Sequence, residues 1–393
     1  MPYNFDEIID RSGTCSIKID VAGYGKPADA LPLWVADMDF KAPLCVIDAL
    51  EKQVRHGIFG YSDSGPEYYE AVRRWQLGHH GFDTQASWLV KTPGVVVALH
   101  IAVRGLTAPG DAVLIQTPVY HPFHTAATLM GRKLVANELV NEADSGKYGI
   151  DFDDFEAKIA QNNVKIFLLC SPHNPVGRVW TREELLRMGE ICLRYGVTVV
   201  SDEIHQDFIF PGHRHTVFAS LSPELSAITV TCTAPSKTFN LAGLMHSNIF
   251  IANPALRDAF VREYELYGLS QLGVLGLVAC QAAYEGGADW LAELLAYLDG
   301  NLTLITNWAQ SRPAAVKFRR PEGTYLAWMD FRSLGLSPRE LDDLVTKKAK
   351  VWLSNGRQFG EAGAGFLRLN AASPRSVIEE ALRRLDTLFP SEY

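Results

Sequence analysis

The chain has 393 residues, of which 47% are hydrophobic and 21% charged, and its formal net charge is −8 at pH 7. This length suffices for two globular domains, and the negative charge argues against a nucleic-acid-binding face. No apolar run approaches the roughly 20 residues that a membrane span needs, and the first residues lack the pattern of a secretory signal. We therefore expect a cytoplasmic protein that acts on a small molecule and contacts neither nucleic acid nor a membrane.

The first part of the chain has no long helical or strand pattern. We interpret residues 1–44 as an arm that packs on other parts of the protein. Asp37 and Asp39 lie near its end and, because aspartate is common just before a helix, they could cap the helix that follows. The spacing of apolar residues then predicts helices over 44–56 and 67–77.

A glycine-led turn opens the next predicted helix. Gly94 stands between Thr92-Pro93 and an apolar run that begins at Val95. The amides of a helix's first turn, here near Val95 and Val96, have no partner within the helix and carry a positive partial charge, so they suit a phosphate group. An ordinary buried helix with a glycine in the preceding turn is the alternative.

Strands and helices then alternate, which predicts an α/β fold with a mostly parallel sheet flanked by helices. The predicted strands are 113–116, 164–170, 197–201, 227–232 and 247–252, and the predicted helices are 122–131, 151–162, 182–194 and 254–267. We expect these segments to form a large domain over residues 45–290. Residues 291–393 would then supply a linking helix and a smaller α+β domain, which the N-terminal arm joins.

Three polar clusters follow predicted strands of this sheet, and each contains one residue with distinctive chemistry. These residues are Asn174, Asp202 and Lys237. Because ligands of open α/β sheets bind at the carboxyl ends of the strands, we expect the three side chains to converge on one crevice. A lone lysine is normally a surface residue, but a buried lysine loses solvation and becomes a nucleophilic amine.

One cofactor accounts for all three residue types. Lys237 would bind the aldehyde of pyridoxal 5′-phosphate (PLP) as an imine, Asp202 would keep the pyridine nitrogen protonated, and Asn174 would hydrogen-bond the phenolic oxygen. The protonated ring is the electron sink that makes a carbanion beside the imine accessible. The three residues together therefore favour a PLP enzyme.

Several motifs carry a resemblance that extends along nearly the whole chain. They are LPLWVADMDF (31–40), GIFGYS (57–62), CSPHNPVG (170–177), SDEIH (201–205), SKTFNLAGL (236–244) and GFLRLN (365–370). In this order they resemble the class I/II aminotransferase superfamily of PLP enzymes, fold type I. Within it they are most similar to the MalY/PatB branch of cystathionine β-lyases, also called carbon–sulfur lyases. The resemblance places the end of the N-terminal arm in the active-site region.

The resemblance also assigns further residues to the site. It implies that Tyr120 stacks on the pyridine ring, and we count Tyr120 with Lys237 as catalytic. Arg368 and Asn174 would bind the substrate, with the guanidinium on the α-carboxylate; an interdomain salt bridge is the alternative for this arginine. Tyr61 would reach the cofactor phosphate and substrate of a partner subunit, which implies a homodimer with active sites at the subunit interface.

Two departures from the superfamily pattern affect the phosphate site. Ala234 replaces a common hydroxyl residue and Met245 replaces a common arginine, so other groups must bind the phosphate. The groups that we expect there are Ser236, Thr233, Tyr61 and the amides of Val95 and Val96. His205 stands where classical aminotransferases have a tyrosine near the phenolic oxygen, and we include it among the cofactor-binding residues.

The remaining histidine clusters do not predict a metal site. His213 and His215, and likewise His121 and His124, have no nearby cysteine. They also lack a carboxylate set at the helical spacing that zinc sites commonly show. We therefore expect no metal.

The main functional hypothesis is a PLP-dependent carbon–sulfur β-lyase. It would cleave L-cystathionine and related cysteine S-conjugates to a thiol, which is homocysteine for cystathionine, with pyruvate and ammonia. An aminotransferase on the same scaffold would use the same residues and is the alternative. A regulator that acts only by contact with a partner is a third hypothesis, which the presence of Lys237, Asp202, Asn174 and Arg368 argues against.

Overall fold

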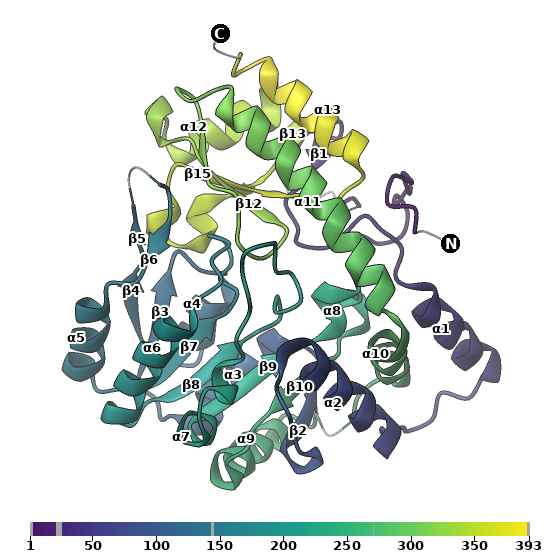
Figure 1. Ribbon diagram of the computed structural model, residues 1–393, viewed down its shortest axis with the longest axis vertical. Helices are drawn as coiled ribbons and strands as arrows, with labels where there is room; N and C mark the ends of the chain where they lie inside the picture. The colour runs from purple at the N-terminus through teal and green to yellow at the C-terminus, as the bar shows by residue number, and fades with distance from the viewer. Residues whose placement is uncertain (1–2, 21–25, 143–144, 270, 391–393) are drawn as a thin grey trace.

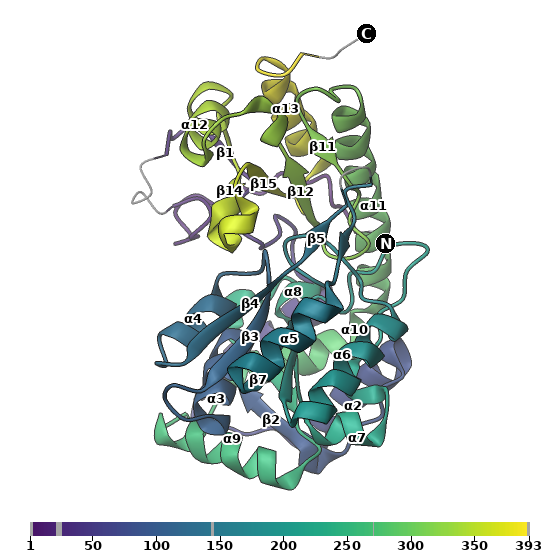
Figure 2. The ribbon, with the colours of Figure 1, turned by 90° about the vertical axis from the view of Figure 1, so that its left-hand side faces the viewer.

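The computed structural model of this protein describes residues 3–20, 26–142, 145–269 and 271–390 (Figures 1 and 2). A large sheet with helices on both faces occupies the lower part of Figure 1, and a smaller sheet lies above it beside the long helix α11 (Ala288–Gln310). Within the described ranges, none of the helices combines the length and the apolar character that crossing a bilayer requires.

The large sheet has seven strands in the order β2-β10-β9-β8-β7-β3-β4. Their bounds are β2 Leu89–Thr92, β3 Ala112–Thr117, β4 Lys133–Glu138, β7 Val164–Cys170, β8 Thr198–Asp202, β9 Thr229–Thr233 and β10 Ser247–Phe250. The strands from β9 to β4 run parallel, whereas β10 pairs antiparallel with β9 and β2. The predicted mostly parallel α/β sheet is therefore confirmed. Strands β2 and β4 were not predicted, because edge strands are only partly buried and have a weak apolar pattern.

Helices cover both faces of this sheet, as Figure 2 shows. They are α3 Val95–Leu106, α4 Pro122–Thr128, α5 Phe152–Asn162, α6 Arg182–Tyr195 and α9 Pro254–Leu266. In β7, Ile166 and Leu168 pack with α3, α4 and α9, whereas Phe167 and Leu169 pack with α5 and α6. Successive side chains of a strand point to opposite faces, so a strand covered on both faces is apolar throughout.

The two helices predicted after the arm are α1 (Leu44–His56) and α2 (Pro66–His80). The N-cap of α1 is Pro43, and no side chain caps this helix. The interpretation of Asp37 and Asp39 as helix caps is therefore wrong. Their carboxylates instead form ion pairs with cations of the N-terminal segment.

Helix α11 leads into the small sheet, an antiparallel sheet with the strand order β11-β12-β15-β14. Its strands are β11 Lys317–Phe318, β12 Leu326–Asp330, β14 Ser354–Asn355 and β15 Phe366–Asn370, and its helices are α12 Pro338–Asp343 and α13 Arg375–Asp386. The arm joins this region, because β1 (Leu31–Pro32) pairs with β13 (Val351–Trp352). The domain boundaries at residues 45 and 291 stay predictions.

Short elements complete the fold. They are the hairpin strands β5 Val140–Asn141 and β6 Tyr148–Gly149, and the helices α7 Pro223–Ala227, α8 Pro235–Thr238 and α10 Val274–Gly286. Helix α8 follows β9 directly and contains Lys237. A helix that follows a parallel strand directly begins at the carboxyl edge of the sheet, so this lysine lies at that edge of the large sheet.

Candidate active site

The three strand-end residues predicted to converge do lie together. Parallel pairing aligns Cys170 with Asp202, and Asp202 with Cys232, so the segments after β7, β8 and β9 leave the sheet at the same edge. A cavity of about 490 Å³ lies there. The predicted site residues that line it are Lys237, Asp202, Asn174, Tyr120, His205, Ser236, Val95, Val96 and Arg368. The roles of these residues stay predictions.

Lys237 lies on the short helix α8, which follows β9. Its Nζ donates to the Ala36 carbonyl at 2.7 Å. Desolvation lowers the pKa of Lys237 to about 8, and the neighbouring Arg368 guanidinium acts in the same direction. A lysine with this pKa is a free amine in a sizeable fraction of molecules near neutral pH, which is what attack on an aldehyde requires.

Asp202 is a buried carboxylate, 5% exposed, at the end of β8. Its Oδ1 accepts from the Ile204 amide at 3.1 Å. Burial raises the pKa of Asp202 to about 7, and the nearby Glu203 adds to the shift while Lys237 opposes it. No lysine, arginine or histidine of the described ranges forms an ion pair with Asp202. A cationic ligand group in the cavity would supply the missing partner.

Arg368 belongs to β15 of the small sheet, and its side chain contacts Asn174, which follows β7 of the large sheet. Its Nη1 donates to Asn174 Oδ1 at 3.0 Å, and its Nη2 donates to the Trp34 carbonyl at 2.9 Å and to Ser354 Oγ at 3.3 Å. In the part of the chain that the structure describes, its partners are thus neutral oxygens, and the alternative of an interdomain salt bridge finds no carboxylate. Burial lowers the pKa of Arg368 to about 10. A carboxylate bound in the cavity would pair with this buried guanidinium and balance its charge.

His205 and Tyr120 lie on the cavity wall. His205 is 3% exposed, and burial holds its pKa well below the usual value, so its imidazole is neutral. Tyr120 is 38% exposed, and burial of its ring raises the pKa of its hydroxyl, so the phenol stays protonated. A neutral aromatic side chain at the mouth of the cavity is suited to stacking on a planar ring.

The N-terminus of α3 forms another part of the wall. Its N-cap is Gly94, with a φ of 142°, a conformation that favours glycine, and no side chain caps the helix. Val95, Val96 and Ser236 line the cavity beside this turn. The first turn of α3 therefore lies at the cavity wall, and the role of its amides in binding a phosphate stays a prediction.

Two residues predicted to bind the phosphate lie elsewhere. Thr233 is fully buried in β9, and its hydroxyl donates to the Asn248 carbonyl at 3.0 Å, so it is not available to a ligand in the cavity. This expectation needs correction, because Thr233 belongs to the pairing of β9 with β10. Tyr61 is 95% exposed and does not line the cavity of its own chain. Its predicted role depends on a second subunit.

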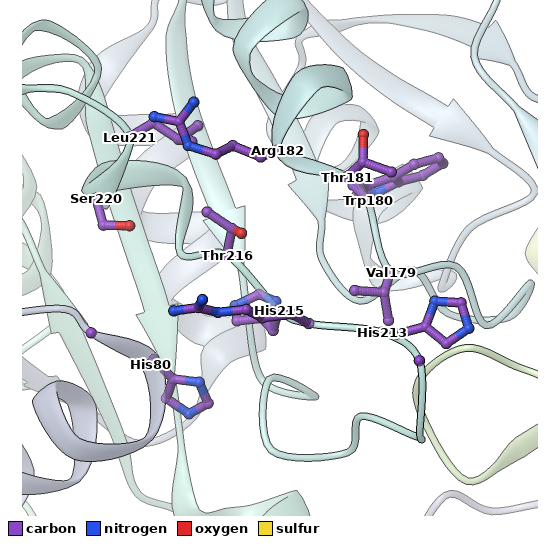
Figure 3. Close-up of a pocket in the computed structure, with 13 residues that line it drawn as sticks. His80, Val179, Trp180, Thr181, Arg182, His213, His215, Thr216, Ser220 and Leu221 are labelled. Atoms are coloured by element: carbon purple, nitrogen blue, oxygen red, sulfur yellow. The ribbon is translucent and has the colours of Figure 1, made fainter.

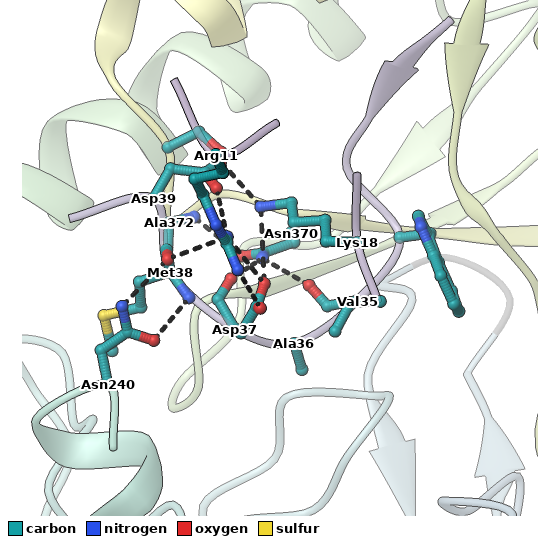
Figure 4. Close-up of polar contacts among 12 residues, drawn as sticks. Arg11, Lys18, Val35, Ala36, Asp37, Met38, Asp39, Asn240, Asn370 and Ala372 are labelled. Atoms are coloured by element: carbon teal, nitrogen blue, oxygen red, sulfur yellow. Dashed lines mark hydrogen bonds and ion pairs between the residues drawn. The ribbon is translucent and has the colours of Figure 1, made fainter. Parts of the chain in front are cut away.

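We call the segment Trp34–Phe40 the strap; Trp34, Val35 and Ala36 line the cavity, and Figure 4 shows the polar contacts of Val35 to Asp39. The sequence did not reveal its contacts, because they are made by backbone carbonyls. The Ala36 carbonyl accepts from both Lys237 and the Tyr325 hydroxyl, the latter at 3.0 Å. Sequence motifs marked this segment, but nothing in them indicated which atoms would face the site.

Two asparagines tie the strap to the catalytic elements. Asn240, three residues after Lys237, accepts from the Met38 amide at 3.0 Å and donates to the carbonyl of the same residue at 3.0 Å. Asn370, two residues after Arg368, donates to the carbonyls of residues 35 and 37, both at 2.6 Å. Both asparagines belong to quoted motifs, SKTFN and LRLN, and their role became clear only from these contacts.

A second cavity, of about 500 Å³, lies apart from the first (Figure 3). His80, His213, Arg214 and His215 are among the residues that line it. His215 is bound to the buried Glu203 carboxylate, with 2.8 Å between Nε2 and Oε2. Throughout the described ranges, no three His, Cys, Asp or Glu side chains are grouped so that they could hold a metal ion.

The residues of the first cavity fit PLP. Lys237 supplies an amine for the aldehyde, and Asp202 is a buried carboxylate that forms no ion pair with the described part of the chain. Within the same described ranges, the α3 N-terminus has no side-chain cap and so offers amides to a phosphate, and the Arg368 guanidinium has no carboxylate partner. Each of these groups is buried or partly buried and complementary to one part of the cofactor or of an amino acid bound to it.

Comparisons with known proteins agree with this geometry. The family model "Aminotransferase class I and II" matches residues 28–385. "Cystathionine beta-lyase PatB" of Bacillus subtilis is 44% identical over 97% of this chain and 98% of its own, and "Protein MalY" of Escherichia coli is 36% identical over 98% of both. The crystal structure of cystalysin from Treponema denticola, which contains a pyridoxal 5′-phosphate cofactor, superposes with a TM-score of 0.95 at 39% identity over 98% of each chain.

These matches extend over nearly the whole chain and include both sheets and the strap. The predicted fold-type I architecture is therefore confirmed. The chain belongs to the aminotransferase class I and II family, in the branch that contains PatB and MalY.

Proposed function

We propose that this protein cleaves L-cystathionine and related cysteine S-conjugates to a thiol, pyruvate and ammonia. Its class is that of a PLP-dependent carbon–sulfur lyase, and its cofactor is pyridoxal 5′-phosphate, as for the relatives whose names and structures state this. The grouping of the Lys237 amine, the Asp202 carboxylate and the Arg368 guanidinium around one cavity supports a PLP enzyme. The 44% identity to the PatB cystathionine β-lyase favours the lyase over the aminotransferase.

Each residue has a separate task in this reaction. Arg368 binds the α-carboxylate of the amino acid and so orients its Cα–H bond. The Lys237 amine removes the proton from Cα, and Asp202 holds the ring nitrogen protonated. When bound, the cofactor would supply a sink for the electron pair left at Cα. This pair then forms the Cα–Cβ double bond as the carbon–sulfur bond breaks with its electrons on sulfur. The thiolate takes up a proton, and water hydrolyses the remaining unsaturated amine to pyruvate and ammonia.

The products decide between a lyase and an aminotransferase. Purified protein incubated with L-cystathionine should release thiol and pyruvate in equal amounts without any added 2-oxo acid. A reaction that requires an added 2-oxo acid and leaves the carbon–sulfur bond intact would contradict the proposal and indicate transamination. The Lys237→Ala protein serves as the blank, because it retains the cavity but lacks the proposed base.

Arg368→Ala tests the carboxylate-binding role. We expect KM for cystathionine to rise by about 30-fold or more, because removal of one partner of a buried charge pair costs at least about 2 kcal/mol. The change in kcat should be smaller, since the reacting bonds do not involve this residue. Steady-state kinetics of Arg368→Ala, Arg368→Lys and the control Arg357→Ala measure this. Arg357 is an exposed residue paired with Glu361, and an equal effect there would refute the assignment.

We propose further that the protein is a cytoplasmic homodimer whose active sites lie at the subunit interface. Tyr61 is 95% exposed, and its neighbours Ile58 and Phe59 are 67% and 58% exposed, so this turn presents apolar surface to solvent in the single chain. A second copy of the chain would cover this surface and bring Tyr61 to the other cavity, where its hydroxyl can reach the cofactor phosphate.

Tyr61→Ala tests this arrangement. We expect the variant to remain a dimer by light scattering but to bind PLP about tenfold more weakly, the effect of losing one hydrogen bond to a charged group. Tyr195→Ala is the control, because Tyr195 is an exposed tyrosine at the end of α6 whose hydroxyl donates to Glu156 of α5. A single-chain mass for the unmodified protein, or unchanged PLP affinity in Tyr61→Ala, would contradict the proposal.

A further inference from the structure

The strap Trp34–Phe40 contacts both the proposed catalytic lysine and the proposed carboxylate-binding arginine. The Ala36 carbonyl accepts from Lys237 Nζ at 2.7 Å, and the Trp34 carbonyl accepts from Arg368 Nη2 at 2.9 Å. The two acceptors lie two residues apart on one extended segment. A displacement of the strap would therefore move an acceptor of Lys237 and an acceptor of Arg368 together.

The side chains of the strap bind the N-terminal segment through a cluster of four charges (Figure 4). Arg11 donates to Asp37 Oδ2 and to Asp39 Oδ1, both at 2.7 Å. Lys18 Nζ lies 2.7 Å from Asp39 Oδ2 and 3.7 Å from Asp37 Oδ1. Arg11 also donates to the Met38 carbonyl at 3.3 Å, so it contacts both the side chains and the backbone of the strap.

Because this cluster is buried, its charged groups must stay close to their partners. The Lys18 side chain is 0% exposed, whereas those of Arg11, Asp37 and Asp39 are 23%, 22% and 17% exposed. Although burial by itself raises the pKa of Asp39, the Lys18 ammonium holds it below its usual range, so Asp39 is ionised. A buried ammonium is tolerated only beside its carboxylates. The strap therefore cannot leave this position without leaving Lys18 buried and unpaired.

Neither Lys18 nor Arg11 lines the cavity. Their contacts with the strap are to Asp37, Met38 and Asp39, next in the chain to Ala36, whose carbonyl accepts from Lys237. We propose that Arg11 and Lys18 are positioning residues for the active site, whose ion pairs with Asp37 and Asp39 hold the strap carbonyls against Lys237 and Arg368. The inference rests on the proposed roles of Lys237 and Arg368.

The test combines a structural and a functional measurement on the holoenzyme. Hydrogen exchange followed by mass spectrometry reports the strap directly, because the Met38 amide donates to Asn240 and the Asp39 amide donates to the Ala372 carbonyl. Steady-state kinetics and the change in cofactor absorbance on adding an amino acid report substrate binding. The variants are Lys18→Met, which has an apolar chain of similar length, and Arg11→Ala, whose residue is partly exposed and less critical for folding.

Lys41→Ala is the matched control. Lys41 belongs to the same part of the chain and pairs with Glu7 at 2.7 Å, but both side chains are largely exposed, 59% and 43%. Exposed ion pairs contribute little. Lys41→Ala should therefore leave strap exchange, amino-acid binding and kinetics unchanged.

We expect Lys18→Met and Arg11→Ala to lose exchange protection over residues 34–40 while keeping protection over β7. Amino-acid binding and kcat/KM should weaken by about 10- to 100-fold, the effect of a displacement of about 1 Å at a catalytic site. In the double variant Lys18→Met/Asp39→Asn, which removes the surplus negative charge, protection and binding should partly recover.

Full protection of the strap in both single variants would overturn the inference, as would lost protection with unchanged amino-acid binding. If Lys18→Met lost exchange protection throughout the chain, that variant would be unfolded, and the result with Arg11→Ala would then decide whether the inference holds. Because hydrogen exchange and amino-acid binding do not depend on which bond is cleaved, these outcomes remain distinct from a failure of the proposed lyase reaction.

Discussion

The Lys237→Ala variant should lose turnover by about 10³-fold or more, because it removes both the amine that binds the cofactor aldehyde and the base that takes the Cα proton. The same variant should keep its fold. Among the residues that the structure describes, the Lys237 side chain donates one hydrogen bond, to the Ala36 carbonyl, and the helix α8 also contains the buried Pro235 and Thr238. Thermal unfolding should therefore change little, and PLP should no longer be retained covalently.

Borohydride reduction followed by peptide mass spectrometry gives the direct measurement. The unmodified protein should carry the reduced cofactor at Lys237, and the variant should carry none. Lys133→Ala is a suitable control, because Lys133 is exposed and bound to Asn162 Oδ1. A cofactor adduct on another lysine, or full turnover in Lys237→Ala, would refute the assignment of this residue.

Asp202→Asn has the second-largest expected effect. The amide retains the size of the side chain but cannot balance a protonated ring nitrogen. Turnover should fall by roughly 10²- to 10³-fold, the range for loss of one preorganised electrostatic contact. Lys237 is untouched, so the variant should still bind PLP covalently. The control is Asp153→Asn, because Asp153 is fully exposed at the start of α5.

Because the pKa of Asp202 is raised, the affinity of the apoprotein for PLP should depend on pH in one direction. Without a cationic partner this pKa is about 7, so the carboxylate becomes protonated as the pH falls below 7. Only the ionised form can pair with a protonated ring nitrogen. PLP affinity of the apoprotein should therefore decrease as the pH falls through 7, and Asp202→Asn should lack this component. Titrations at several pH values measure the difference, and identical pH profiles would contradict the role of Asp202.

The fold was largely predictable because its core is made of uniformly apolar strands. A run such as Val164–Cys170 is buried on both faces, and such runs alternate with amphipathic helices only in α/β architectures. The edge strand β4 was not predictable in the same way, since its outer residues are exposed and its pattern is weak. Pairing with a neighbour, rather than local sequence, makes this segment a strand.

The candidate site divides in a similar manner. The sequence alone determined that Asn174, Asp202 and Lys237 follow consecutive strands and so converge, because parallel strands present their carboxyl ends at one edge. Only the tertiary structure decided that Thr233 turns to Asn248 instead of the cavity, and that Asp37 and Asp39 bind cations rather than cap α1. The Lys237–Ala36 and Arg368–Trp34 contacts join residues 201 and 334 positions apart through backbone carbonyls. Every residue has a backbone carbonyl, so no sequence pattern can mark the carbonyls of Ala36 and Trp34. The packing of the strap against Lys237 and Arg368 selects them.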